Sequence, residues 1–346
     1  MQISEIGEFG LIHRIQKKWI DSGVAAPVLI GIGDDAAATR PTPGKALLLT
    51  TDILIEQVHF DRSFSTLFQV GYKAVSVNAS DIAAMGGHPL YFLVSLGVSG
   101  AETVADIDQL YRGMRQASLP MNISLVGGNT THSPRLFVSL TLIGEAPPKE
   151  IITRSGGDHR DLLYVTGTLG DAAAGLEILQ NRDRKRDVKA GNRRPDWPSL
   201  IRRHLVPRAR LQEGRLLAKK KIPSAMIDLS DGLSSDLSHL ANQSGVGAEL
   251  DLENIPLSYS LRRYAKIMGV DPLSYALHGG EDYELLFSVP KRNKGKMDAL
   301  INQGSIAARC IGRLVEKKSG LLVKDADGSV RPLKSKGYDH FGSNNS

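Results

Sequence analysis

Short apolar runs alternate with amphipathic segments along the first half of the chain, and this pattern predicts strands alternating with helices. Residues 9–19 are predicted to form a helix, because Leu11 and Ile12 lie four and three positions before Ile15. The apolar runs at 28–32 and 46–49 predict buried strands, each ending at an acidic turn. The same reading gives helices at 68–78 and 104–117, the first carried on or restarted at 80–82, and strands at 90–96, 123–126 and 136–144.

The second half repeats this alternation after the Pro147-Pro148 pair, which is the best candidate for a domain junction. A chain of 346 residues also favours two domains. The expected elements are strands at 161–166, 224–229 and 283–289, helices at 170–179 and 207–219, and a further helix with Leu233, Leu237, Leu240 and Ala241 on one face. We therefore predict an α/β (α+β) protein with domains at 1–148 and 149–346.

Five acidic segments stand where an apolar run is expected to meet a turn. They are Gly31-Ile-Gly-Asp-Asp-Ala36, Thr50-Thr-Asp-Ile-Leu-Ile-Glu56, Asn78-Ala-Ser-Asp-Ile82, Ile227-Asp-Leu-Ser-Asp-Gly232 and Gly279-Gly-Glu-Asp-Tyr-Glu284. Carboxylates brought together repel one another unless hard cations neutralise them, and Mg²⁺ binds through one or two carboxylates plus substrate phosphates. The set therefore predicts a polyphosphate site, although each segment taken alone also fits an ordinary turn.

The segment at 227–232 is the most informative of the five. Alternation along a strand would point Asp228 and Ser230 away from the core, and Ser230 or Asp231 would cap the following helix. Capping accounts for one of these residues but leaves Asp228 unexplained. A second polar segment, Gly127-Gly-Asn-Thr-Thr131, is expected to end a strand, where it would either wrap phosphates or form a simple hairpin.

The net charge of +6 is concentrated in one stretch, because residues 182–194 hold seven Lys and Arg against two Asp. This stretch, taken with its flank as a basic loop at 182–196, reads first as a solvated loop, then as a contact to a phosphate-bearing ligand or to nucleic acid. Cys310 is the only cysteine, which excludes an intrachain disulfide and a cysteine-based metal cluster. With no apolar run long enough to span a membrane and no secretory signal, we expect a cytoplasmic protein without membrane or nucleic-acid partners.

The common phosphate-binding loop, the dinucleotide glycine motif, the kinase catalytic loop and the His-Glu-x-x-His motif are all absent. The ordered set of segments instead resembles the thiamine-monophosphate kinases, a family of the aminoimidazole-ribonucleotide-synthetase-like superfamily. The resemblance runs over nearly the whole chain, from Glu5-Ile-Gly-Glu-Phe-Gly-Leu-Ile12 through Thr50-Thr-Asp-Ile-Leu-Ile-Glu-Gln-Val-His-Phe60, Lys73 to Gly87, Val165 to Leu176, and Ile227-Asp-Leu-Ser-Asp-Gly-Leu233, to Gly279-Gly-Glu-Asp-Tyr-Glu-Leu285 and Gly337-Tyr-Asp-His-Phe341.

The resemblance implies a two-domain PurM-like fold in a homodimer whose N-terminal sheets pair, with the C-terminal domain bearing substrate and Mg²⁺ loops. It implies ATP as co-substrate, several Mg²⁺ ions, and in-line phosphoryl transfer to thiamine monophosphate without a covalent nucleophile, giving thiamine diphosphate. The implied Mg²⁺ ligands are Asp35, Thr50, Thr51, Asp52, Asp81, Asp228 and Asp231, with Asn129 standing where many members carry Asp. The implied ATP contacts are Tyr111, Gly128, Asn129, Arg154 and Ser230, and the implied substrate contacts are His59, Glu281 and Tyr338.

The closest alternatives are other enzymes of the same superfamily: the purine-pathway synthetases, selenophosphate synthetase and the hydrogenase-maturation dehydratase. The last two are expected to use cysteine, or its selenium analogue, near one terminus, whereas Cys310 lies in a predicted strand. A non-catalytic nucleic-acid binder built on the basic loop would show steeply salt-dependent affinity and would leave the acidic segments unexplained.

Overall fold

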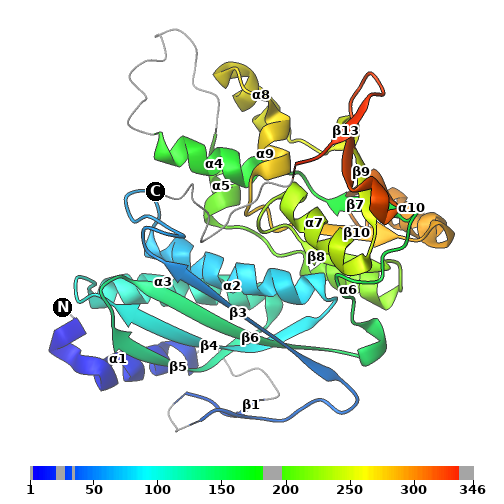
Figure 1. Ribbon diagram of the computed structural model, residues 1–346. Helices are drawn as coiled ribbons and strands as arrows, with labels where there is room; N and C mark the ends of the chain where they lie inside the picture. Colours follow the sequence, from blue (N-terminus) through cyan, green and yellow to red (C-terminus); the bar gives the residue numbers. More distant parts are fainter. Residues whose placement is uncertain (1–2, 21–27, 33–35, 182–196, 335–346) are drawn as a thin grey trace. The chain divides into compact units, whose positions relative to one another are not determined.

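The computed structural model describes residues 3–20, 28–32, 36–181 and 197–334 (Figure 1). The chain forms two compact units, here called unit 1 (Met1–Ile82 with Gly87–Ile151) and unit 2 (Ala83–Gly86 with Ile152–Ser346). The chain finally passes from unit 1 to unit 2 just after the Pro147-Pro148 pair.

Unit 1 is built on a four-stranded sheet with the strand order β3-β6-β4-β5. Its strands are β3 (Ala46–Ile55), β4 (His88–Val98), β5 (Ser124–His132) and β6 (Phe137–Ala146), and only β4 and β5 run parallel. The helices α2 (Leu67–Ala84) and α3 (Val104–Ser118) cover one face of this sheet (Figure 1). Phe92, Leu140 and Leu142 are completely buried there.

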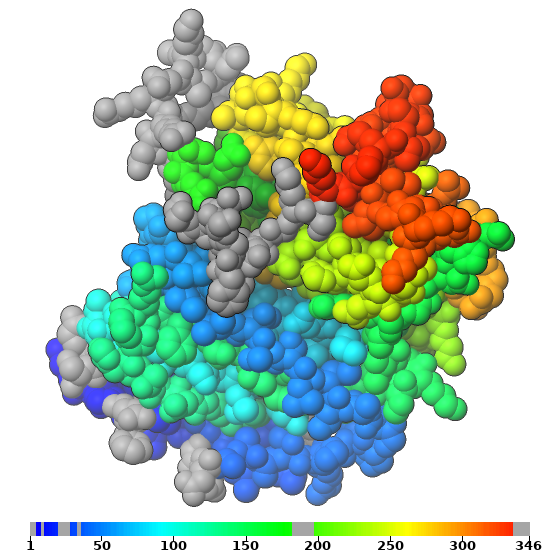
Figure 2. Space-filling view, viewed as in Figure 1, coloured from blue at the N-terminus to red at the C-terminus, as the bar shows by residue number. Residues whose placement is uncertain are grey.

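The register of the sheet shows which side chains share its other face. Leu93 in β4 and Thr51 in β3 both pair with Thr141 in β6. Because paired residues point to the same side and side chains alternate along a strand, Leu47, Leu49 and Ile53 lie on the face of Leu93 and Thr51. These three apolar residues of β3 are 46%, 70% and 42% exposed. The space-filling view in Figure 2 draws the part of the chain that includes β3 in blue.

The remaining elements of unit 1 are α1 (Ile3–Ile20), the short pair β1 (Val28–Ile30) and β2 (Ala38–Thr39), and 3₁₀ turns at Leu119–Met121 and Pro148–Glu150. Asp108 in α3 ties α1 to the rest of the unit, with Arg14 Nε at 2.9 Å and Lys18 Nζ at 2.6 Å. Where α2 crosses α3, a Cβ on Gly113 would lie 1.8 Å from the carbonyl oxygen of Phe68, so only glycine permits this approach.

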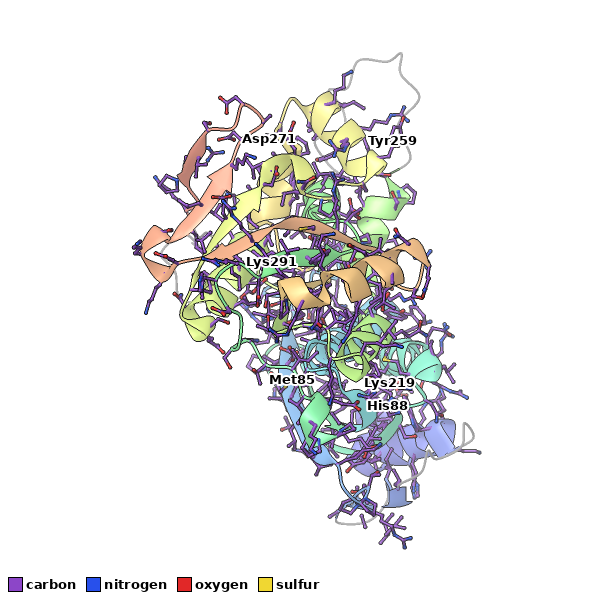
Figure 3. The ribbon with its side chains drawn as sticks, turned by 90° about the vertical axis from the view of Figure 1, so that its right-hand side faces the viewer. Met85, His88, Lys219, Tyr259, Asp271 and Lys291 are labelled. Atoms are coloured by element: carbon purple, nitrogen blue, oxygen red, sulfur yellow. The ribbon has the colours of Figure 1, made fainter. Side chains whose placement is uncertain are left out.

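Unit 2 has a seven-stranded sheet with the strand order β13-β12-β9-β11-β7-β10-β8. The strands are β7 (Leu162–Thr166), β8 (Ala225–Asp228), β9 (Gly247–Asp251), β10 (Leu285–Val289), β11 (Ala308–Val315), β12 (Leu321–Lys324) and β13 (Val330–Pro332). The helices are α4 (Asp171–Gln180), α5 (Pro198–Leu205), α6 (Leu211–Lys219), α7 (Leu233–Ser244), α8 (Tyr259–Met268), α9 (Pro272–His278) and α10 (Lys294–Asn302), with 3₁₀ turns at Leu252–Asn254, Lys291–Asn293 and Lys317–Ser319. Figure 3 marks the starts of α8 and α9 by Tyr259 and Asp271.

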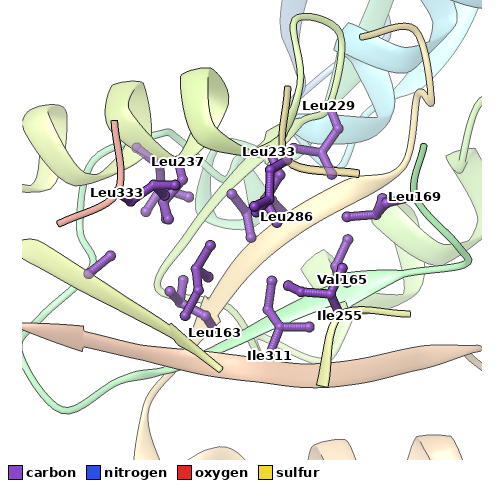
Figure 4. Packing of buried hydrophobic residues seen from close by; sticks show 14 of the residues in the cluster. Leu163, Val165, Leu169, Leu229, Leu233, Leu237, Ile255, Leu286, Ile311 and Leu333 are labelled. Carbon is purple, nitrogen blue, oxygen red and sulfur yellow. The ribbon is translucent and has the colours of Figure 1, made fainter. Parts of the chain in front are cut away.

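Two apolar cores hold unit 2 together. In the first, Leu233 and Leu237 of α7 pack with Leu163, Leu286 and Ile311 of the sheet (Figure 4). The second contains Ala83 and Ala84 from the distant end of α2, together with Leu217 of α6 and Met226 of β8. A Cβ on Gly214 would lie 2.2 Å from the carbonyl oxygen of Ala83, so the backbones meet closely here.

Three local expectations are corrected by the fold. The residues 50–52 and 127–130 do not end strands but lie inside β3 and β5. Asp81 lies within α2, which carries on to Ala84 as one of the two readings of 80–82 allowed, so the turn expected at this acidic segment is absent. The helix α7 begins after Gly232, which makes no side-chain cap, so neither Ser230 nor Asp231 caps it.

Candidate functional site

A carboxylate pair with a hydroxyl forms the acidic site of unit 1. Thr50 and Asp52 lie on the helix-covered face of β3, and Thr50 Oγ1 donates a hydrogen bond to Asp81 of α2. Burial and then the charge of Asp81 raise the pKa of Asp52 to about 6. A carboxylate whose charge is disfavoured by a second carboxylate is the arrangement that a divalent cation relieves.

Thr51 lies apart from this pair, because neighbouring residues of a strand point to opposite faces. Its hydroxyl donates to the carbonyl oxygen of Leu140 at 3.2 Å and accepts from Thr141 at 3.2 Å. The structure thus places Thr50 and Asp52 with Asp81, and the side chain of Thr51 on the opposite side of the sheet.

A pocket of about 940 Å³ opens on that opposite face of unit 1. Three of the predicted ATP contacts, Tyr111, Gly128 and Asn129, line it together with apolar residues such as Leu93 and Ile143. Burial raises the pKa of the Tyr111 phenol, which therefore stays protonated. A Cβ on Gly128 would lie 2.0 Å from the carbonyl oxygen of Val94, so glycine is required for β5 to approach β4. The lining combines apolar with polar side chains, and a concave site that combines the two is suited to binding a ligand.

Two further predicted residues have local contacts, and two fall outside the described residues. Nδ1 of His59 accepts a hydrogen bond from the backbone amide of Ile55 at 3.1 Å, which leaves Nε2 to carry the proton in the neutral ring. Arg154 of unit 2 is exposed, and its carbonyl oxygen accepts from Ser244 at 3.1 Å. Asp35 and Tyr338 lie outside the described residues, as does the basic loop at 182–196.

The acidic loop after β8 is held by a residue of α7 that sequence reasoning missed. Asp228 is 2% exposed. Asp236 of α7 accepts hydrogen bonds from the backbone amides of Asp231 and Gly232, both at 3.1 Å. Burial, then the charges of Asp228 and Asp231, raise the pKa of Asp236 to about 8. The carboxylates of Asp228, Asp231 and Asp236 thus influence one another, and that of Asp236 binds the backbone of the loop.

In the segment 279–284 the three carboxylates have separate partners. Glu281, the predicted substrate contact, lies 2.8 Å from Nδ1 of His204 in α5. Asp282 accepts from the amide of Gly170 at 2.6 Å and so binds the start of α4. Glu284 is fully buried and accepts from Arg203 and Arg210. Sequence reasoning missed these partners, because they come from α4 and α5 and the acidic segment itself does not show what each carboxylate contacts.

Neither a ready-made metal centre nor a membrane-spanning helix occurs in the described ranges. Over these residues, no group of three or more His, Cys, Asp and Glu side chains is arranged to hold a metal ion by itself. Mg²⁺ commonly takes only one or two carboxylates, with water and substrate phosphate as its other ligands. No helix in the same ranges is long and apolar enough to cross a membrane.

Known proteins resemble the chain along its whole length. The sequence models of the AIR synthase related protein match residues 33–146 for the N-terminal domain and 161–324 for the C-terminal domain. Thiamine-monophosphate kinase of Aquifex aeolicus (strain VF5) is 39% identical over 341 residues, covering 99% of this chain and all of that protein. Thiamine-monophosphate kinase of Escherichia coli (strain K12) is 39% identical over 343 residues, covering 97% and 98%.

The chain belongs to the thiamine-monophosphate kinase family. It is therefore an enzyme of the kinase class, and the predicted two-domain PurM-like α/β fold is confirmed. The crystal structure of thiamine-monophosphate kinase from Stenotrophomonas maltophilia K279a has a TM-score of 0.79 at 33% identity, with 94% of this chain and 98% of that one covered. The structure of AaThiL complexed with AMPPCP and TMP has a TM-score of 0.75 at 38% identity, with 99% of each chain covered.

A more distant likeness concerns the fold alone. Hydrogenase Maturation Protein HypE in complex with ATP has a TM-score of 0.72 at 20% identity, covering 93% of this chain. HypE and this protein thus share the fold.

Proposed function

We propose that the protein transfers the γ-phosphoryl group of ATP to thiamine monophosphate, giving thiamine diphosphate and ADP. The observation that carries the proposal is the full-length similarity to AaThiL, a family member whose structure holds AMPPCP and TMP. AMPPCP is an analogue of ATP, and we take TMP to be thiamine monophosphate, in keeping with the names of the relatives.

The residues of this chain suit such a transfer. The terminal phosphate of thiamine monophosphate is already ionised, so attack in line with the leaving ADP needs no strong general base or covalent nucleophile. We infer that Tyr111, Gly128 and Asn129 bind ATP, since they line one pocket of unit 1. Arg154 and Ser230 of unit 2 remain predicted ATP contacts, and His59, Glu281 and Tyr338 remain predicted substrate contacts.

The chemistry of the donor set fits Mg²⁺. Burial, and then the charge of Asp81, raise the pKa of Asp52 to about 6, and Thr50 adds a hydroxyl beside Asp81. In unit 2, Asp228 and Asp231 would contribute further carboxylates. Bound there, Mg²⁺ would neutralise phosphate charge during the transfer. Asn129 would offer an uncharged amide oxygen, and Asp35 and Thr51 remain predicted ligands.

We also propose that the enzyme is a homodimer that pairs through the unit 1 sheet. The support is the row of exposed apolar side chains on one face of β3, at Leu47, Leu49 and Ile53, continued by Leu93 of β4, which is 38% exposed. Apolar surface of this kind on a strand and its neighbours is typical of interaction sites. Sedimentation of the purified protein tests this, and a monomer at micromolar concentration would refute it.

An ADP-release assay tests the substrate. Thiamine monophosphate, thiamine and aminoimidazole precursors are offered side by side with ATP and Mg²⁺, and we expect turnover only with the monophosphate. Release with thiamine but not with its monophosphate would overturn the proposal.

The carboxylates are tested in the same assay by Asp52→Ala and Asp228→Ala. We expect each variant to lose at least ~100-fold in kcat, because phosphoryl transfer depends on electrostatic stabilisation worth several kcal/mol. Asp327→Asn, which changes an exposed turn residue of unit 2, is the matched control and should keep full activity. Wild-type rates for both alanine variants at saturating Mg²⁺ would exclude the assigned metal sites.

A further inference from the structure

The segment Gly279–Glu284 is held in an unusual backbone shape. Glu281 and Tyr283 have positive φ angles of 69° and 49°, a region that residues other than glycine seldom adopt. Such a conformation persists only where the surroundings determine it. The backbone is fixed along one side, because the amides of Glu281 and Tyr283 donate to the carbonyl oxygens of Ser230 and Leu229 at 2.7 and 2.9 Å.

Two of the three carboxylates in the segment Gly279–Glu284 are buried and hold it to other parts of unit 2. Asp282 is 4% exposed and binds the start of α4, while Glu284 is fully buried against Arg203 and Arg210. The side chain of Glu281 is 29% exposed. It is therefore the carboxylate of this segment that a ligand can reach.

The residue beside Glu281 is His204, the last but one residue of α5. Its side chain is 5% exposed, and its Nδ1 lies 2.8 Å from Oε2 of Glu281. The preceding residue, Arg203, lies 2.6 Å from Glu284. Two successive residues of α5 thus contact two different carboxylates of the same segment.

We propose that His204 is a positioning residue, which orients the Glu281 carboxylate toward the cationic ring of the thiamine substrate. This inference rests on the proposed function. The Glu281 side chain has three rotatable bonds, and the 2.8 Å contact of its Oε2 with the buried imidazole of His204 restricts the carboxylate to one orientation. Because the backbone at Glu281 is held separately by Ser230, loss of His204 should release the carboxylate without moving the loop.

The test compares His204→Leu with His204→Asn. Leucine fills the buried space but donates nothing, whereas the amide nitrogen of asparagine can stand near the position of Nδ1. For His204→Leu we expect the KM for thiamine monophosphate to rise about tenfold, since the carboxylate loses the polar contact that orients it. The KM for ATP should change less than about twofold, and His204→Asn should recover most of the loss.

Tyr264→Phe is the control for damage to the helical layer of unit 2. It removes the hydrogen bond of 2.8 Å that Tyr264 donates to Glu177 of α4, and it should leave both KM values unchanged. Thermal unfolding of each variant shows that it is folded.

A double-mutant cycle with Glu281→Gln shows whether His204 acts through Glu281. If it does, His204→Leu adds little to the KM of the Glu281→Gln protein. The inference is overturned if His204→Leu leaves the KM for thiamine monophosphate unchanged, raises both KM values equally, or has its full effect in the Glu281→Gln background. If the wild-type protein does not turn over thiamine monophosphate at all, the proposed function itself fails and this inference falls with it.

Discussion

Neutralising Glu284 should destabilise unit 2 strongly. Its carboxylate is fully buried and accepts hydrogen bonds from Thr166, Arg203 and Arg210, each at 2.5 to 2.6 Å. In Glu284→Gln the shape is kept, but two guanidinium groups lose their counter-charge. Removing one partner of a buried ion pair costs about 3–5 kcal/mol. Because Arg203 and Arg210 keep 23% and 17% of their side-chain surface exposed, we expect the lower end, about 3 kcal/mol.

Thermal unfolding measures this loss. One kcal/mol shifts Tm by about 2–4 °C in a domain of 150–250 residues, so Glu284→Gln should lower Tm by roughly 6–12 °C. The control is Glu316→Gln in the same unit. It removes the exposed ion pair between Glu316 and Lys318, whose atoms lie 2.7 Å apart, and should shift Tm by less than ~2 °C.

The pH dependence gives an independent check. Burial by itself would raise the pKa of Glu284, but the hydrogen bond and charge of Arg210, then the charge of Arg203, hold the pKa below its usual range. The stabilisation is therefore present above the unfolded pKa of about 4.3 and is lost as pH falls through the lower folded pKa. The gap in Tm between wild type and Glu284→Gln should shrink in acid. A variant that melts with the wild type at pH 7 would refute this account of the buried network.

Two further substitutions test the packing and the linkage. Gly113→Ala should prevent normal packing of α2 on α3, because its Cβ would lie 1.8 Å from a backbone oxygen. The control, Gly295→Ala in α10, meets nothing within 4 Å and should stabilise the protein by up to ~1 kcal/mol in urea unfolding. Equal stability of the two variants would contradict the close approach of α2 and α3. Burial raises the pKa of Asp282 to about 7, so its contribution to stability is lost as pH rises from about 4 towards 7. The Tm of Asp282→Asn relative to wild type should therefore increase between pH 5 and 8, and a constant difference would show that Asp282 titrates normally.

The sequence was most informative where chemistry and local pattern coincide. The strand before Asp228, the strand holding Cys310 and the apolar face of α7 follow from periodicity. The pairing of Asp52 with Asp81 could be suspected from composition, but its geometry depends on α2 lying against β3. No local rule places residues 29 positions apart on one side of a sheet.

What sequence reasoning missed depends on contacts between distant segments. The helix α5 is short and follows the basic stretch, so its periodicity is hard to recognise. His204 and Arg203 contact Glu281 and Glu284, which lie about 80 residues later in the chain, so no local pattern reveals these pairs. Likewise, Asp236 looks like a solvated helix residue until the backbone of the preceding loop turns toward it.

The placement of Ala83–Gly86 in unit 2 limits how this protein can recombine with its relatives. A single crossover at Ile151 would exchange the two halves of the chain, yet it would bring a foreign Ala83 and Ala84 into the core of the new C-terminal half. The backbone contact at Gly214 leaves no room for a larger neighbour there. A chimera within the family should therefore take residues 83–86 from the same parent as its C-terminal half. The segment to be exchanged is thus not a continuous piece of sequence.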